Sequence, residues 1–203
     1  QQIDLDTDFT VTVSDTGNVS ALTLTTIDDN TPGIVTVTNA VTLTGTAAQI
    51  RLAAQRDAAD TLRLAAAFGA TLDAGSVAAT DLTTIVGQTS ATIDATAATT
   101  ITGTASAVVS AINDGQVNHD DNFLVSLTAD STAAAADLKT INTATSGIIT
   151  ATGVATITGS ASDVTDVLAV ETNQGNAGQQ IDLDTDFTVT VSDTGNVSAL
   201  TLT

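Results

Sequence analysis

Two clusters of aspartates are the side chains best suited to bind a ligand. In each cluster the acidic residues lie immediately before or close to a phenylalanine, and in the first cluster they alternate along the chain. Alternation places carboxylates on one side of an extended segment, where a hard divalent cation with oxygen ligands would relieve their mutual repulsion. The clusters predict a loose Ca²⁺ site with these ligands: Asp4, Asp6, Asp8, Asp120 and Asp121.

The spacing of the first cluster excludes an EF-hand. The aspartates match the start of such a loop, but the position that needs glycine for the turn carries Phe9, and no terminal glutamate follows. A looser site could draw further oxygens from a third polar stretch, Asp28, Asp29 and Asn30. The alternative interpretation is a solvated acidic edge, whose charges block unwanted strand pairing.

The sequence carries no set of residues that predicts catalysis. His119 is the sole histidine, and a catalytic role would need a nucleophile or a second base beside it. There is no cysteine, and Gly175 and Gly178 lack the lysine and the following helix of a phosphate-binding loop. We therefore expect His119 to be a solvent-exposed loop residue and the protein not to be an enzyme.

The composition excludes several classes of protein. The 203 residues include 23 acidic and 4 basic side chains, and the net charge of −19 opposes binding to nucleic acid and to anionic membrane surfaces. No apolar stretch is long enough to span a membrane, and the N-terminus lacks the basic start and apolar run of a signal peptide. A hydrophobic share of 42% is enough to form a core, which argues against disorder.

The sequence repeats itself with a period of 178 residues, because residues 1–25 and 179–203 are identical. We expect residues 1–178 to be one full period and residues 179–203 to be the start of the next, with both termini cut from a longer array. We also expect the strand around Phe187 to pack on the unit that ends near Leu168. The second copy would then complete a fold.

Three diverged units make up the period. The motif Thr-Ile/Leu-Thr-Gly-Thr/Ser-Ala recurs at Gly45, Gly103 and Gly159, and all four phenylalanines occupy the same place in their units. We expect one large aromatic anchor in each small core. The units are about 59 residues long and span approximately residues 10–67, 68–122 and 123–186.

Within a unit, the pattern alternates between strand and helix. The residues that follow each phenylalanine have the period-two apolar positions of a strand, and the Ala-rich segments after them open with polar N-cap residues and predict short helices. β-Branched runs with a central kink come next, and then a second helix. This order predicts an α/β repeat protein, in which strand-helix-strand-helix modules stack in a solenoid or a beaded fibre. An all-β solenoid is the alternative, if the Ala-rich segments are turns.

The second helix of the first unit is predicted to be the longest, over residues 47–68. Thr46 and Gln49 fit a capping box at its start. The helix contains three of the four basic residues. We expect local surface pairs between bases and acids three or four residues apart, formed by Arg56, Arg63, Asp57 and Asp60.

Two segments, ITATGVATITGSASDV at 149–164 and IDATAATTITGTASAV at 93–108, resemble the tandem repeats of giant secreted bacterial surface proteins. Such repeats are common in cyanobacteria and are adhesin-like. The resemblance implies a secreted polypeptide, an extracellular or cell-surface location, and export signals outside this part of the chain. The calcium-binding nonapeptide Gly-Gly-x-Gly-x-Asp of related proteins is missing here.

These observations favour a structural role. We expect a tandem-repeat segment of an extracellular fibre or giant cell-surface protein, which acts as a spacer or scaffold and self-assembles into filaments, with neighbouring repeats and copies of itself as partners. The alternative is a calcium-dependent adhesion or ligand-binding module of a surface adhesin. Such a module would present an acidic or Thr-rich face to glycans, ice or another cell-surface ligand.

Overall fold

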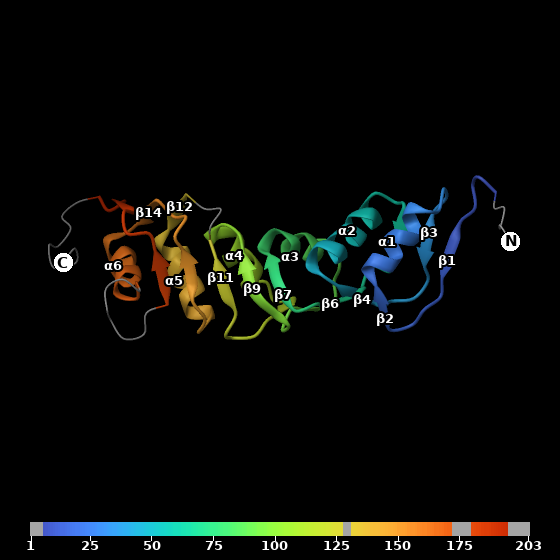
Figure 1. Cartoon of the computed structure of the whole chain (residues 1–203), viewed down its shortest axis with the longest axis horizontal. Coiled ribbons are helices and arrows are strands. Elements are labelled where there is room, and N and C mark those ends of the chain that lie inside the picture. Colours follow the sequence, from blue (N-terminus) through green and yellow to red (C-terminus); the bar gives the residue numbers. More distant parts are fainter. Residues whose placement is uncertain (1–5, 128–130, 172–179, 195–203) are drawn as a thin grey trace.

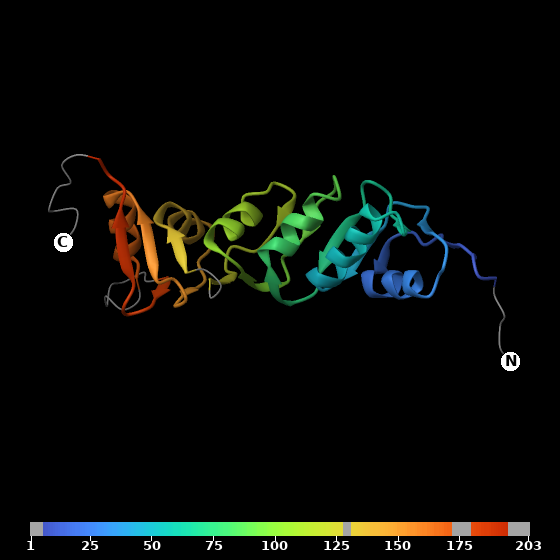
Figure 2. The ribbon, with the colours of Figure 1, turned by 90° about the horizontal axis from the view of Figure 1, so that it is seen from above.

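The computed structural model describes residues 6–127, 131–171 and 180–194 of the chain. Within these ranges, short strands and six α-helices alternate along an elongated row, with β1 (Val11–Val13) at one end and α6 (Ala161–Ala169) near the other (Figures 1 and 2). None of the helices described has the length and apolar character needed to cross a membrane.

The elements have the following bounds. The other helices are α1 (Ala21–Asp29), α2 (Ala47–Ala58), α3 (Ala79–Val86), α4 (Ala105–Ile112) and α5 (Ala135–Ala144). The strands after β1 are β2 (Asn18–Ser20), β3 (Val35–Val37), β4 (Thr42–Gly45), β5 (Leu62–Arg63), β6 (Gly69–Leu72), β7 (Gly75–Ala78), β8 (Ile93–Asp94), β9 (Ala98–Thr102), β10 (Val117–Asn118), β11 (Leu124–Ser126), β12 (Thr132–Ala134), β13 (Ile149–Ala151), β14 (Thr156–Gly159), β15 (Ile181–Leu183) and β16 (Thr188–Val191).

The described strands form four parallel sheets. Two have five strands, in the orders β2-β4-β6-β8-β10 and β7-β9-β11-β13-β15, and two have three strands, in the orders β1-β3-β5 and β12-β14-β16. Partner residues most often lie 24 positions apart, as do Val11 and Val35 or Ile101 and Val125. The chain therefore returns beside its earlier path at regular intervals, and the helices supply the crossovers that parallel strands need.

The row contains two places where one sheet gives way to the next. Between most successive helices the chain forms two strands, but it forms three between α2 and α3 and again between α4 and α5. The middle strands of these triplets are β6 and β11, and each is the central strand of a five-stranded sheet. In each triplet the first strand is the edge of one sheet, the middle strand is the centre of a second, and the last strand is the edge of a third.

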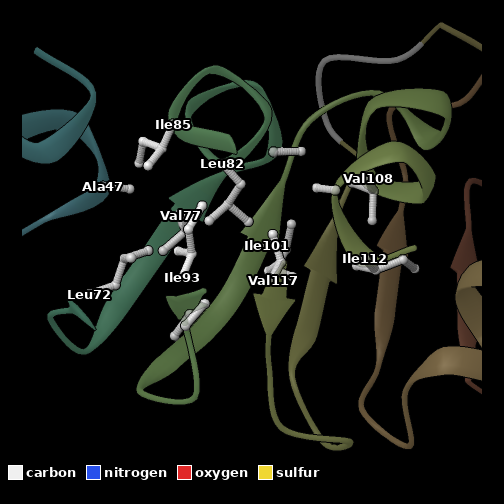
Figure 3. Packing of buried hydrophobic residues seen from close by; sticks show 14 of the residues in the cluster. Ala47, Leu72, Val77, Leu82, Ile85, Ile93, Ile101, Val108, Ile112 and Val117 are labelled. Carbon is white, nitrogen blue, oxygen red and sulfur yellow. The ribbon is translucent and has the colours of Figure 1, made fainter. Parts of the chain in front are cut away.

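The core runs without a break along the row. Buried residues from Val13 to Leu183 belong to one apolar cluster, and each helix contacts the next in sequence. Figure 3 shows Val77, Leu82 and Ile101 packed together between α3 and the strands beside it. Most members are Ala, Val, Ile and Leu, so the core is thin and depends on close approach of the elements.

The structure confirms the α/β class and the order of strand and helix. The all-β alternative is wrong, because the Ala-rich segments form helices α1, α3 and α5. Their predicted polar N-cap residues are wrong in each case: the expected cap Asn18 lies within strand β2, and α1 begins after Ser20. Ser76 lies within strand β7, and α3 and α5 begin after Ala78 and Ala134 without a side-chain cap. The polar residues there lie in or beside strands that the sequence did not reveal.

The predicted helix over residues 47–68 is too long, although its capping box between Thr46 and Gln49 is present. The helix ends at Ala58, and Asp60 adopts a left-handed φ of 61°. Beyond it, Leu62 is fully buried in β5 and pairs with Val35. Burial of this leucine in a sheet stabilises the chain more than another turn of exposed helix would.

The glycine of the repeated motif has a structural reason to be there. Gly45, Gly103 and Gly159 have φ values of 142°, 151° and 158°, between the end of a strand and the N-cap of a helix. Only glycine adopts this conformation without strain. The motif therefore marks equivalent strand-to-helix junctions.

The second copy of the 25-residue segment packs as expected on the end of the row. β16 pairs with β14 and contacts α6. The amide N–H of Ala161, the first residue of α6, donates a hydrogen bond to a carboxylate oxygen of Asp193 at 2.5 Å. Residues that follow β16 thus cap the last helix described.

Candidate functional site

The predicted metal ligands lie at separate places along the row. Asp4 lies outside the described residues, Asp6 and Asp8 are exposed before β1, and Asp120 and Asp121 are exposed before β11. Figure 1 shows β1 at one end of the row and β11 beyond its middle, toward the C-terminal end. In the part of the chain that the structure describes, no three acidic or histidine side chains are grouped to hold a metal ion.

The local contacts of the acidic clusters are those of loops. The Thr7 amide donates to the Asp6 carboxylate at 2.8 Å, and the Thr185 amide donates in the same way to Asp184 in the second copy. The third stretch is engaged elsewhere, because Asp28 and Asp29 both pair with Arg56 at 2.7 Å. The calcium site stays a prediction. Asp28 and Asp29 are already paired with the guanidinium group of Arg56.

His119 differs from the expectation of an exposed loop residue. It is half-buried, and its ring packs edge-on against Phe123 with the ring centroids 4.9 Å apart. Its Nδ1 lies 3.0 Å from the Asp120 carbonyl oxygen and its Nε2 lies 3.3 Å from that of Ile112. The ring therefore closes the loop before β11 over the aromatic anchor.

A shallow hollow beside His119 has a volume of about 590 Å³ and is also lined by Asp121, Asn142 and Gln180. Thr145 at its wall is buried, and its hydroxyl donates to the Phe123 carbonyl oxygen at 2.5 Å. This hydroxyl is therefore committed to the fold.

The basic residues tie successive helices together. Arg51 of α2 pairs with Asp81 of α3 at 2.7 Å, and Lys139 of α5 pairs with Asp163 and Asp166 of α6 at 2.7 Å. Arg56 of α2 reaches back to α1, where its partner Asp28 has only 8% of its side chain exposed. Three of the four basic residues thus bridge neighbouring helices.

The expected local pairs were correct in only one case. Arg63 pairs with Asp60 at 2.7 Å, as predicted. Asp57 instead accepts a hydrogen bond from the Leu64 amide at 2.7 Å and closes the turn that follows α2. The inter-helix partners lie 24 to 30 positions away, close to the spacing of paired strands, and the sequence carried no signal that revealed this spacing.

The ion pair between α5 and α6 shifts the pKa of both partners. Hydrogen bonds from Lys139 and from Ser160 hold the pKa of Asp163 below its ordinary value of 3.8. Hydrogen bonds to Asp163 and Asp166 raise the pKa of Lys139 to about 12. Both groups are therefore charged at neutral pH, which favours the contact between the helices.

Apolar residues form ladders across the sheets. In one five-stranded sheet the ladder runs Val77, Ile101, Val125, Ile149 and Ile181, and in the other it runs Val19, Leu43, Ala70, Ile93 and Val117. The central residues of both ladders are buried, with exposures of 1% for Val125 and 2% for Ala70. Val189, on the outermost strand of a three-stranded sheet, is 39% exposed. The free edge of β16 thus exposes an apolar residue at a ladder position that is buried in the centre of the five-stranded sheets.

Comparisons with protein-family models, with curated proteins and with solved structures find no match for this chain.

In the described strands, Thr and Ser hydroxyls form rows of at most three paired residues. Thr102, Ser126 and Thr150 are laterally paired in one sheet, but the next strand places Asp182 in the row. All four residues are half-buried. Rows this short differ from the broad flat array that regular binding to ice would require.

Proposed function

We propose that the chain is a structural tandem-repeat segment of an extracellular fibre or giant cell-surface protein, in which strand-helix layers stack as an α/β solenoid and act as a spacer. The observation that carries this proposal is the single core that runs from Val13 to Leu183 between parallel strands at a recurring step of 24 residues. Each layer buries its apolar residues against the next layer, so length can be added without changing the core.

The staggered sheets support a straight spacer. Helices pack about 8–10 Å apart, whereas paired strands lie about 4.7–4.9 Å apart. A solenoid with one continuous sheet and one continuous row of helices must therefore curve. In this chain each five-stranded sheet overlaps the next, which begins at β7 or β12, directly after the central strand β6 or β11 of the sheet before it. This stagger lengthens the strand side and reduces the curvature.

The surface chemistry supports an exposed, non-aggregating thread. The net charge is −19, and most of the few basic residues are used within the row to join its helices. A uniform negative charge makes separate threads repel each other side by side. The resemblance of residues 93–108 and 149–164 to repeats of secreted bacterial surface proteins supports the extracellular location.

Immunogold electron microscopy of the cells that produce the protein tests this role. Antibodies raised against the purified chain are expected to label intact cells, with gold particles in lines that extend away from the envelope, because every period carries the same epitopes. Permeabilised cells are the control for internal protein. Labelling that requires permeabilisation, or that stays in a single layer at the envelope, would contradict an extracellular spacer.

A further inference from the structure

The two three-stranded sheets contain the same sequence at their open edges. Strand β1 belongs to the 25-residue segment at the start of the chain, and β16 belongs to the identical segment that starts at residue 179. Among the strands that the structure describes, β1 pairs only with β3, and β16 pairs only with β14. The same sequence therefore pairs with a later strand, β3, in its first copy and with an earlier strand, β14, in its second copy.

If the two copies of this strand are treated as one, the two registers combine into one complete sheet. Val11 and Val189 are equivalent, since they lie 178 positions apart in identical segments. Val11 pairs with Val35, and Val189 pairs with Ile157. The combined order is β12-β14-β16/β1-β3-β5, which has five strands and a central strand that follows a phenylalanine. The two complete sheets have this same arrangement around β6 and β11.

The combined ladder also has the apolar character of the complete ones. It runs Ala133, Ile157, Val189/Val11, Val35 and Leu62. The four residues that flank the centre are at most 2% exposed, whereas Val189 is 39% exposed and Val11 is partly exposed. The phenylalanines behave in the same way, because Phe68 and Phe123 are buried while Phe9 and Phe187 are only half-buried. Exposure is concentrated where one half of the sheet is missing.

A second contact links the same two halves. Asp193 caps the first amide of α6, but its equivalent Asp15 is exposed, and no hydrogen bond to its carboxylate is found among the described residues. In a junction with a preceding period, Asp15 would take the position that Asp193 occupies here. The unpaired strand edge and the unused helix cap would therefore both be satisfied by the same neighbour, an adjoining period.

We propose that the free edge of β16 binds the β3 segment, residues 35–37, of a following period in the same polypeptide, in the register of Val189 with Val35. This inference rests on the proposed repeat stacking and specifies its junction. A single strand serves as β16 of one period and β1 of the next, so no segment is displaced. In a separate chain, β3 is already paired with that chain's own β1. This β1 would have to dissociate from β3 before β3 could pair with β16.

Cysteine accessibility tests the junction, because the chain has no cysteine of its own. Val189→Cys is placed in the 203-residue chain and in a two-period chain, in which residues 1–178 are followed by residues 1–203. A maleimide is expected to modify the cysteine at least 10-fold more slowly in the two-period chain, where the second period covers residue 189. Equal rates in the two chains would overturn the proposal.

Two matched variants calibrate the rates. Leu124→Cys lies on the central strand β11 with 45% exposure and should react fast in both chains, whereas Val125→Cys lies one residue on with 1% exposure and should react slowly in both. If Val189→Cys is protected in the 203-residue chain as its concentration rises, separate chains occupy the edge and the assignment to the same polypeptide is wrong.

Small-angle scattering on the two-period chain separates this inference from the proposed function. An extended particle with a fast-reacting residue 189 would contradict the sheet junction and leave the spacer role intact. A compact particle would contradict the spacer role itself.

Discussion

At the scale of single residues, two glycines lie in close contact with the backbone of a phenylalanine. Gly147 lies against Phe123, and a Cβ atom there would come within 2.3 Å of the Phe123 carbonyl oxygen. Gly33 stands in the same relation to Phe9, at 2.6 Å. The neighbouring Thr145 hydroxyl donates to the Phe123 carbonyl, so the phenylalanine backbone is held by one residue and tightly approached by another.

We expect Gly147→Ala to lower the free energy of unfolding by about 1–3 kcal/mol, because the backbone carbonyl that the methyl group would meet cannot move without breaking the hydrogen bond from Thr145. Gly115→Ala is the matched control, since a Cβ atom there meets nothing within 4 Å. Urea unfolding of the full chain measures both. Equal midpoints for the two variants would contradict the close approach.

At the scale of elements, the helices differ in how they begin and how they are joined. Ser20, Thr46, Thr104 and Ser160 each accept a hydrogen bond from an amide in the first turn, so α1, α2, α4 and α6 have capped starts. α3 and α5 lack such caps. Their neighbours supply other support: Asp81 of α3 pairs with Arg51 of α2, and Lys139 of α5 pairs with α6.

The ion pair between α5 and α6 predicts a pH dependence. The folded pKa of Asp163 is lowered, so its contribution to stability is present above the unfolded pKa of about 3.8 and is lost as the pH falls through the lower folded value. Asp163→Asn should therefore unfold at lower urea than the unmodified chain at pH 7. The difference should disappear at a pH below the folded pKa.

A control for this prediction is Asp120→Asn, whose exposed carboxylate makes no ion pair or hydrogen bond in the described part of the chain. Its unfolding midpoint should stay close to that of the unmodified chain at both pH values. A difference for Asp163→Asn that persisted unchanged in acid would rule out the ionised carboxylate as its source.

At the scale of the whole molecule, the row is open at both described ends and has no closing element there. β1 and β16 leave strand edges unpaired, and both carry the same sequence. Exposed edges normally invite uncontrolled pairing. Here the pairing register at β1 and the pairing register at β16, together with the helix cap by Asp193, fit the two ends of successive periods to each other. In the proposed junction the ends are therefore specific for a further period.

Local signals in the sequence predicted much of this architecture. The glycines at 45, 103 and 159 and the capping box at Thr46 are determined by nearby backbone geometry, so they could be recognised from short segments. Strand β7 could not, because its residues also suit the start of a helix, and its place depends on pairing with β9. The recurring 24-residue step was hidden because sequence similarity follows the longer unit, which contains two helices.

The interactions that distinguish the molecule were harder to predict. Arg56 has acidic neighbours in its own helix, but its partners Asp28 and Asp29 lie on α1, and only the packing of helix against helix brings them together. The helix that was expected to continue to residue 68 ends early because buried Leu62 joins a sheet. Tertiary contacts decided both cases.

Small-angle X-ray scattering on chains of one, two and three periods, each ended by the 25-residue copy, tests the central claim most directly. Six helices are described within residues 1–178, and steps of about 8–10 Å between packed helices would add about 50–60 Å per period. We predict a maximum dimension that grows by this constant increment, with an unchanged cross-sectional radius. A maximum dimension that grows with the cube root of the mass would contradict the stacked row.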